Sequence, residues 1–326
     1  MIEHVLVPLD TSPVAECAVP HAVALAQPFG AEITLLHAME PPHSTAASSF
    51  VDPLDWNLQK VEVSCYLEDM VARLRQANVR AQYLLLDGKP ADCIVRTAQS
   101  YDQACLVLSS HAQGGMSEWK IGSVAQQIMS RRHVSTMIVR ADSSVGRELQ
   151  SWHYRRVLVP LDGSLRAECV LPLVMMLADF HETHVILAHV ITGPEMPRGI
   201  LTPHEDLELA HRLTEHRRVD ALHYLVQSRA KAGPDTEIRL LMSDNRADTL
   251  HKLIEEEKID LVVMSAHGYS GKAEWPYGSL VINFITNCTT SLLIVQDLPE
   301  EPEPIREEFT SRGAQALLQQ RRPFGV

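Results

Sequence analysis

Residues 259–279 combine residue types whose spacing could bind an anion. The apolar run at 261–264 ends in the small residues Ser265, Ala266, His267 and Gly268, and after a short gap Gly278 and Ser279 open a second apolar run. This order predicts a buried strand, a loop and the start of a helix. Free N–H groups and the positive end of a helix dipole face whatever lies at such a turn. A phosphate group fits that chemistry.

The same arrangement occurs earlier, in residues 104–123. His111 recurs as His267, 156 residues later (267 − 111), and Ser123 recurs as Ser279 at the same offset. Residues 4–26 likewise match residues 156–178, where the offset is 152. The difference places four extra residues in the second crossover of the second copy. The chain therefore contains an internal repeat, here called half 1 and half 2.

Strand and helix patterns alternate through both halves. First strands are expected at residues 5–7 and 157–159, second strands at 33–37 and 185–189, third strands at 82–86 and 237–242, and last strands at 136–139 and 291–295. Both second crossovers contain a helical stripe, and further helices begin near residues 91 and 247. This alternation predicts a doubly wound, Rossmann-like α/β fold with parallel sheets and helices on both faces. Ligands of such sheets bind at the carboxyl ends of the strands.

The first helix of each half has recognisable local features. Residues 10–12 and 162–164 are expected to form its N-terminal cap. Pro20 and Pro172 lie inside the helical pattern, where a kink is expected. Cys17 and Cys169 occupy matched places on this helix and are interpreted as small buried residues.

Composition limits the classes of function. The chain has 326 residues, enough for two domains, and a formal net charge of −12 from 41 acidic and 29 basic residues. This charge argues against a nucleic-acid or anionic-membrane binder. The six cysteines lack C-x-x-C spacing and the first residues lack a signal-peptide pattern, so a cytoplasmic protein is expected. The 16 histidines show no metal-ligand spacing, so no metal site is predicted.

The repeat also sets the expected domain boundaries. Domain 1 covers residues 1–140 and domain 2 covers residues 154–297. Residues 141–153 are polar, have no counterpart in the repeat and are interpreted as a linker. Residues 298–326 form a tail rich in proline and glutamate.

Each half resembles a universal stress protein domain, and the whole chain resembles the tandem form of that family. The resemblance rests on the VLVPLD-[TG]-S start, the LLH or LAH second strand, the S-x-H turn and the terminal G-S. It implies five-stranded parallel sheets that pair through their last strands, within one chain here, with a homodimer as a further assembly. Many members bind ATP or AMP through the pattern G-x2-G-x9-G-[ST], so ATP or AMP is the expected ligand, with Mg²⁺ as a companion of the phosphates.

The resemblance assigns a nucleotide site to half 2. Asp162 and Val190 would lie at the adenosine end, Met264 and His267 against the ribose and first phosphate, and the loop glycines at the phosphates. Ser265 replaces the first glycine of the pattern. The complete expected set is Pro160, Asp162, Val190, Met264, Ser265, His267, Gly268, Gly278, Ser279 and Leu280.

Half 1 departs further from the family pattern. Ser109 and Ala112 replace the first two glycines, and Thr11 stands where half 2 has Gly163. A weaker second site is therefore expected there. Its residues are Pro8, Asp10, Ala38, Leu108, Ser109, His111, Gly122, Ser123 and Val124.

Other interpretations remain for several of these residues and for the function. His111 and His267 could cap the end of a strand by bonding the backbone, and Trp119 and Trp275 could be packing residues. The leading hypothesis is a non-catalytic nucleotide-binding stress protein that acts on an unidentified partner protein. One alternative is an interaction module without nucleotide. A slow ATP hydrolase is the third, but the sequence lacks a Walker-type lysine and a clear general base.

Overall fold

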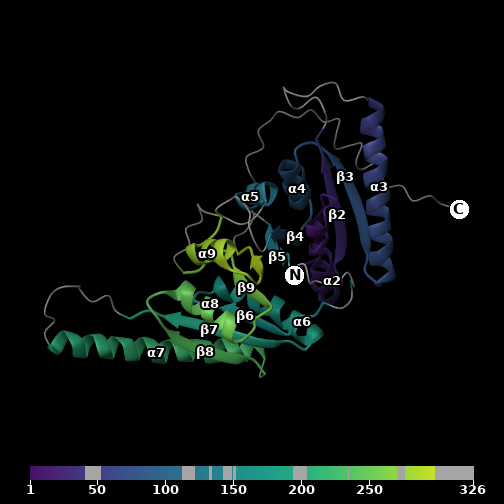
Figure 1. Cartoon of the computed structure of the whole chain (residues 1–326). Helices are drawn as coiled ribbons and strands as arrows, with labels where there is room; N and C mark the ends of the chain where they lie inside the picture. The colour runs from purple at the N-terminus through teal and green to yellow at the C-terminus, as the bar shows by residue number, and fades with distance from the viewer. Residues whose placement is uncertain are drawn as a thin grey trace.

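The ten strands of the described residues form a single sheet (Figure 1). The computed structural model describes residues 1–40, 53–111, 122–131, 134–141, 149, 152–193, 204–233, 235–269 and 276–297. The strand order is β3-β2-β1-β4-β5-β10-β9-β6-β7-β8. The chain thus has the predicted α/β class, with five parallel strands in each half.

The elements of half 1 follow the expected alternation. They are β1 (His4–Pro8), α1 (Pro13–Glu16), α2 (Ala18–Phe29), β2 (Glu32–Met39), α3 (Pro53–Gln76), β3 (Ala81–Asp87), α4 (Pro90–Gln99), β4 (Ala104–His111), α5 (Ser123–Met129) and β5 (Ser135–Ala141).

Half 2 repeats this order with a longer crossover helix. Its elements are β6 (Arg156–Pro160), the 3₁₀ helix η1 (Ala167–Val170), α6 (Leu171–His181), β7 (His184–Ile191), α7 (His204–Ala232), β8 (Glu237–Met242), α8 (Arg246–Glu256), β9 (Leu261–Ser265), α9 (Ser279–Asn287) and β10 (Ser291–Val295). Helix α7 has 29 residues and α3 has 24, in agreement with the insertion inferred from the change of offset.

The two halves join through their last strands, as the resemblance implied. Strands β5 and β10 pair antiparallel, with Ile138 opposite Leu292 and Met137 opposite Leu293. Figure 1 shows β5 and β10 at the junction, with α5 and α9 on one face of the sheet and α2 and α6 on the other. The predicted pairing of the halves is therefore confirmed within one chain.

Alternate residues of each strand supply two different cores. In β6, Val157 and Val159 join a core that also contains residues of α2 and α6, while Leu158 joins a core with Val281 and Phe284 of α9. Continuous apolar runs are expected for strands covered on both faces. Both cores include residues from the two halves, so the pairing is a packed interface and not only a ladder of hydrogen bonds.

Pro20 and Pro172 lie in the first turn of a helix that follows a short helical turn. Pro172 lies in the first turn of α6, after the 3₁₀ turn η1, and Pro20 lies in the first turn of α2, which begins after Cys17. The missing N–H of proline costs nothing in a first turn, where N–H groups lack intrahelical partners. The expectation of buried cysteines is also wrong, because Cys17 is half-buried and Cys169 is exposed.

Histidines from α2 and α6 reach across the interface between the halves. His21 is 1% exposed, and its Nδ1 lies 3.0 Å from the hydroxyl oxygen of Tyr154. The Nε2 atom of His181 bonds the carbonyl of Ala24 at 2.8 Å. Trp152, at the end of the expected linker, packs on His21 with ring centroids 4.2 Å apart. Residues 298–326 and most of the expected linker lie outside the described residues.

The first turn of the two halves differs in backbone strain. Thr11 has φ +64°, a left-handed conformation that is costly for a β-branched residue, whereas Gly163 at the matched place has φ +89°. We expect Thr11→Gly to stabilise the protein by about 1 kcal/mol and Gly163→Thr to destabilise it by at least about 1 kcal/mol. Urea unfolding of both variants measures this, and a destabilising Thr11→Gly would contradict the strain.

Burial lowers the pKa of His21 to about 3. In the unfolded chain the His21 ring binds a proton near pH 6.5, whereas in the folded protein it stays neutral down to about pH 3. The stability that depends on the neutral ring is therefore present above pH 6.5 and is lost as the pH falls towards 3. At low pH the wild-type protein should lose on the order of 3–5 kcal/mol of its free energy of unfolding through His21. We expect His21→Asn, which can still bond Tyr154, to abolish this loss. Urea midpoints between pH 7 and pH 4 measure it, and parallel pH profiles for wild type and variant would contradict it.

Candidate functional site

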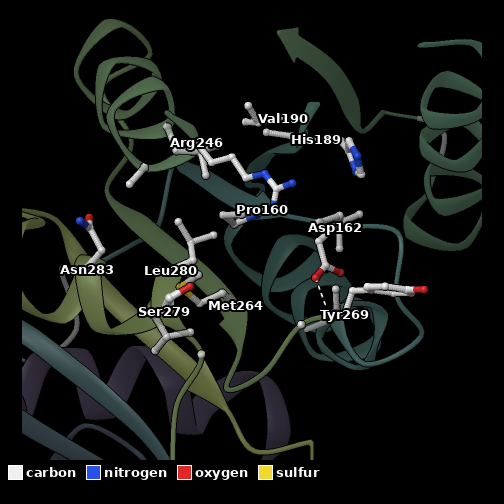
Figure 2. Close-up of a pocket in the computed structure, with 18 of the residues that line it drawn as sticks. Pro160, Asp162, His189, Val190, Arg246, Met264, Tyr269, Ser279, Leu280 and Asn283 are labelled. Atoms are coloured by element: carbon white, nitrogen blue, oxygen red, sulfur yellow. Dashed lines mark hydrogen bonds between the residues drawn. The ribbon is translucent and has the colours of Figure 1, made fainter. Parts of the chain in front are cut away.

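A cleft of about 1350 Å³ lies at the carboxyl ends of the strands of half 2. Strands β7 and β8 lie on one side of β6, and β9 and β10 lie on the other, so the cleft is at the point where the strand order reverses. The predicted residues that line it are Pro160, Asp162, Val190, Met264, Ser265, Gly268, Gly278, Ser279 and Leu280 (Figure 2). Of the ten predicted residues, His267 is therefore the one outside the lining.

Asp162 ties the turn after β6 to the loop after β9. Its Oδ1 accepts hydrogen bonds from the N–H of Ser164 at 3.1 Å and from the hydroxyl of Ser164 at 2.7 Å. Its Oδ2 accepts from the N–H of Tyr269 at 2.6 Å. The hydroxyl of Ser164 in turn accepts from the N–H of Ala167 at 3.1 Å. The serine thus holds the first residue of η1, and the aspartate orients the serine.

The two loop glycines of half 2, Gly268 and Gly278, differ in how much space surrounds them. A Cβ on Gly268 would lie 2.0 Å from Oδ2 of Asp162, so the loop has no room for a side chain there. Gly268 does not have a positive φ, so its backbone conformation does not explain the glycine. A Cβ on Gly278 would meet nothing closer than 3.6 Å, and the backbone there has φ −70°. A side chain at 268 would therefore have to displace the carboxylate of Asp162, whereas the fold does not require glycine at 278.

Helix α9 begins at the cleft without a side-chain cap. Gly278 is its N-cap residue in an extended conformation, and among the described residues no side chain caps the first turn. Ser279, Leu280 and Val281 of that turn line the cleft. Uncapped N–H groups and the helix dipole give this end a partial positive charge. An anion in the cleft would find its donors here.

Ser265 and His267 use their side chains inside the protein. The hydroxyl of Ser265 donates to the carbonyl of His267 at 2.6 Å. The Nδ1 atom of His267 lies 2.8 Å from Oδ1 of Asp297, and both side chains are 1% exposed. Arg166 lies 3.6 Å from the other oxygen of Asp297. The ring of His267 thus bonds a carboxylate at the strand end.

The sequence analysis missed several residues that line the cleft. They are His189, Asp244, Asn245, Arg246, Tyr269 and Asn283. His189 ends the repeated LAH strand, and that repeat was an available signal. Arg246 opens α8, and Figure 2 shows it reaching into the cleft above Pro160. Among the described lining residues it is the one arginine or lysine.

Charges in the cleft act on His189. Burial lowers the pKa of His189, Arg246 lowers it further, and Asp162 opposes them. The net lowering keeps the ring neutral at neutral pH. Arg246 therefore contributes the fixed positive side-chain charge near Asp162 and His189.

The predicted residues of half 1 lie at matching strand ends. Pro8 ends β1, Ala38 lies near the end of β2, Leu108 and Ser109 lie in β4, and Ser123 opens α5 after Gly122. Asp10 repeats the capping geometry, since its Oδ1 accepts from the N–H of Ser12 at 3.0 Å. Residues 112–121 and 270–275, with both tryptophans, lie outside the described residues. No group of three histidine, cysteine or acidic residues suited to a metal occurs in the described part.

Comparison with known proteins identifies relatives for both halves. The family model described as the universal stress protein family matches residues 1–140 and 153–296. Universal stress protein YxiE of Bacillus subtilis is 27% identical over 149 residues, which is 43% of this chain and 100% of that protein. Universal stress protein A of Escherichia coli is 28% identical over 142 residues, 42% of this chain and 93% of its own length. Each of these relatives thus matches less than half of the chain.

Solved structures share the two-half arrangement. A universal stress protein from Archaeoglobus fulgidus has a TM-score of 0.60 and 15% identity, over 90% of this chain and 96% of its own. A protein described as functionally unknown from Pseudomonas aeruginosa has a TM-score of 0.64 and 9% identity, over 90% and 92%. At these identities the likeness shows the fold. Among the described helices, none is both long and apolar enough to cross a membrane.

The contact between Asp162 and Gly268 can be tested by a double-mutant cycle. We expect Gly268→Ala to destabilise the protein by about 1–3 kcal/mol, because its Cβ displaces the carboxylate that bonds Tyr269. The same change in an Asp162→Ala background should cost clearly less, because the clash is gone. Gly278→Ala, where a Cβ fits, is the matched control. Urea unfolding measures all four variants, and additive effects would contradict the contact.

Proposed function

The chain belongs to the universal stress protein family, and from that premise we propose that it is a non-catalytic protein that binds an adenine nucleotide, ATP or AMP, in the cleft of half 2. The bound nucleotide would change the surface that half 2 presents to a partner protein. Half 1 would bind the same ligand more weakly.

The open start of α9 carries this proposal. Gly278 is not needed by the fold, yet it stands where a side chain would narrow the approach to the uncapped first turn. A phosphate bound to these N–H groups would explain why position 278 is a glycine. Ser265, which departs from the family pattern, does not obstruct this approach, because its hydroxyl is folded back onto the carbonyl of His267.

The other end of the cleft suits an adenosine. Val190, Met264 and Leu280 offer apolar surface for a base, and the carboxylate of Asp162 can accept hydrogen bonds from ribose hydroxyls. Arg246 offers a guanidinium that can stack on a base. Since the described residues offer no cluster of three metal-ligating side chains, Mg²⁺ with ATP would be held mainly by the phosphates. AMP would need no metal.

A substitution at Gly278 separates binding from stability. Gly278→Asp should supply the missing helix cap, so stability should hold or rise by up to about 1 kcal/mol. The same carboxylate would occupy the N–H groups and repel phosphate, so the Kd for AMP or ATP should rise at least about 30-fold, about 2 kcal/mol. Calorimetric titration and urea unfolding measure both effects.

The matched control is Gly122→Asp at the start of α5, which should leave the half 2 site unchanged. Freshly purified protein should also be denatured and its released small molecules identified by mass spectrometry. No released nucleotide, together with no heat on adding ATP or AMP, would reject the proposal in favour of an interaction module. Unchanged affinity in Gly278→Asp would reject the site. Linear phosphate release from ATP would show a hydrolase.

A further inference from the structure

The C-terminal turn of α9 is held by a residue of half 1. The Nη2 atom of Arg140 donates to the carbonyl of Phe284 at 3.2 Å and to that of Ile285 at 2.6 Å. Arg140 belongs to β5, and 7% of it is exposed. A buried cation at the C-terminal end of α9 also interacts favourably with the negative pole of the helix dipole. The helix that opens on the cleft at one end is therefore fixed by the other half at its far end.

The strand pairing explains why Arg140 reaches this place. Ile138 pairs with Leu292 in the antiparallel ladder, so Arg140, two residues later, is level with the turn between α9 and β10. Within half 1, the Nη1 atom of Arg140 donates to the hydroxyl of Ser110 at 3.0 Å, and Ser110 is its partner in the β4–β5 register. The guanidinium thus bridges a strand of half 1 and a helix of half 2.

Among the described residues, half 2 has no matching bridge to half 1. The matched positions in half 2 hold Ala266 for Ser110 and Gln296 for Arg140, so neither the hydroxyl nor the guanidinium is repeated. Gln296 instead donates its backbone N–H to the hydroxyl of Ser135 at 3.1 Å. Ser110 lies between Ser109 and His111, two predicted residues of the half 1 site. The bridge therefore links the strand end of one candidate site to the helix of the other.

We propose that Arg140 is a positioning residue of the half 2 cleft, through which half 1 sets the place of the phosphate-binding helix. The ligand in this inference rests on the function proposed above, whereas the effect on α9 can be measured without ligand. Losing charge-assisted hydrogen bonds to two buried carbonyls should loosen α9 locally before the whole protein unfolds. The uncapped first turn would then hold an anion less well.

Hydrogen exchange of the unliganded protein tests the mechanical part. In Arg140→Met, amides of α9 should exchange about 10-fold faster, while amides of α8 and of β1 stay unchanged. Arg140→Lys, which keeps the charge but lacks the fork, should give an intermediate effect and serves if the methionine variant does not fold. Ser110→Ala should loosen α9 less than Arg140→Met. Gln296→Ala, at the matched position of half 2, is the control.

Titration with AMP at a temperature where each variant is fully folded tests the link to binding. Arg140→Met should raise the Kd about 5- to 10-fold, and Gln296→Ala should leave it unchanged. Unchanged α9 exchange, or equally faster exchange throughout the core, would overturn the inference, and so would an unchanged Kd in Arg140→Met. If wild type binds neither AMP nor ATP, the proposed function fails, while the exchange of α9 still decides the role of Arg140.

Discussion

The antiparallel pairing of β5 with β10 is the constraint on which the rest of the molecule depends. Either strand alone would be a sheet edge with unpaired N–H and C=O groups, and pairing removes both edges at once. It also merges the cores, because Met129 and Ile138 of half 1 pack in the same cluster as Phe284 of α9. On the other face, Tyr154 is fully buried against His21. The candidate site of half 2 therefore stands on an interface, not on an independent domain.

The two halves keep one backbone plan but have diverged in the side chains that matter most. Gly163 accepts a left-handed turn that Thr11 makes under strain. Arg246 enters the half 2 cleft, whereas its counterpart in half 1 is Pro90, which has no charge. Arg140 supports α9, and nothing equivalent stands at Gln296. The two halves therefore differ in charge and in backbone strain at the strand ends where their candidate sites lie.

The sequence predicted the strands well, because strands buried on both faces appear as continuous apolar runs and the repeat located each of them twice. The pairing of the halves came from the family resemblance. The sequence pattern could not predict contacts between residues that are far apart in the chain. Gly268 lies against the carboxylate of Asp162, and His267 meets Asp297, contacts that only the folded chain creates. Arg246 was not marked by the repeat, because the matched residue in half 1 is Pro90.

A protein with a net charge of −12 can still hold an anion if the charges near the ligand favour it. At physiological ionic strength the screening length is about 8 Å, so most of the surface carboxylates have little influence in the cleft. Figure 2 places Asp162 and Ser279 apart in the cleft, with Arg246 reaching between Val190 and Pro160. Asp162 attracts donors such as ribose hydroxyls, while the start of α9 attracts phosphate. The start of α9 is therefore the part of the cleft whose backbone favours an anion, whereas the end with Asp162 and Arg246 carries charges of both signs.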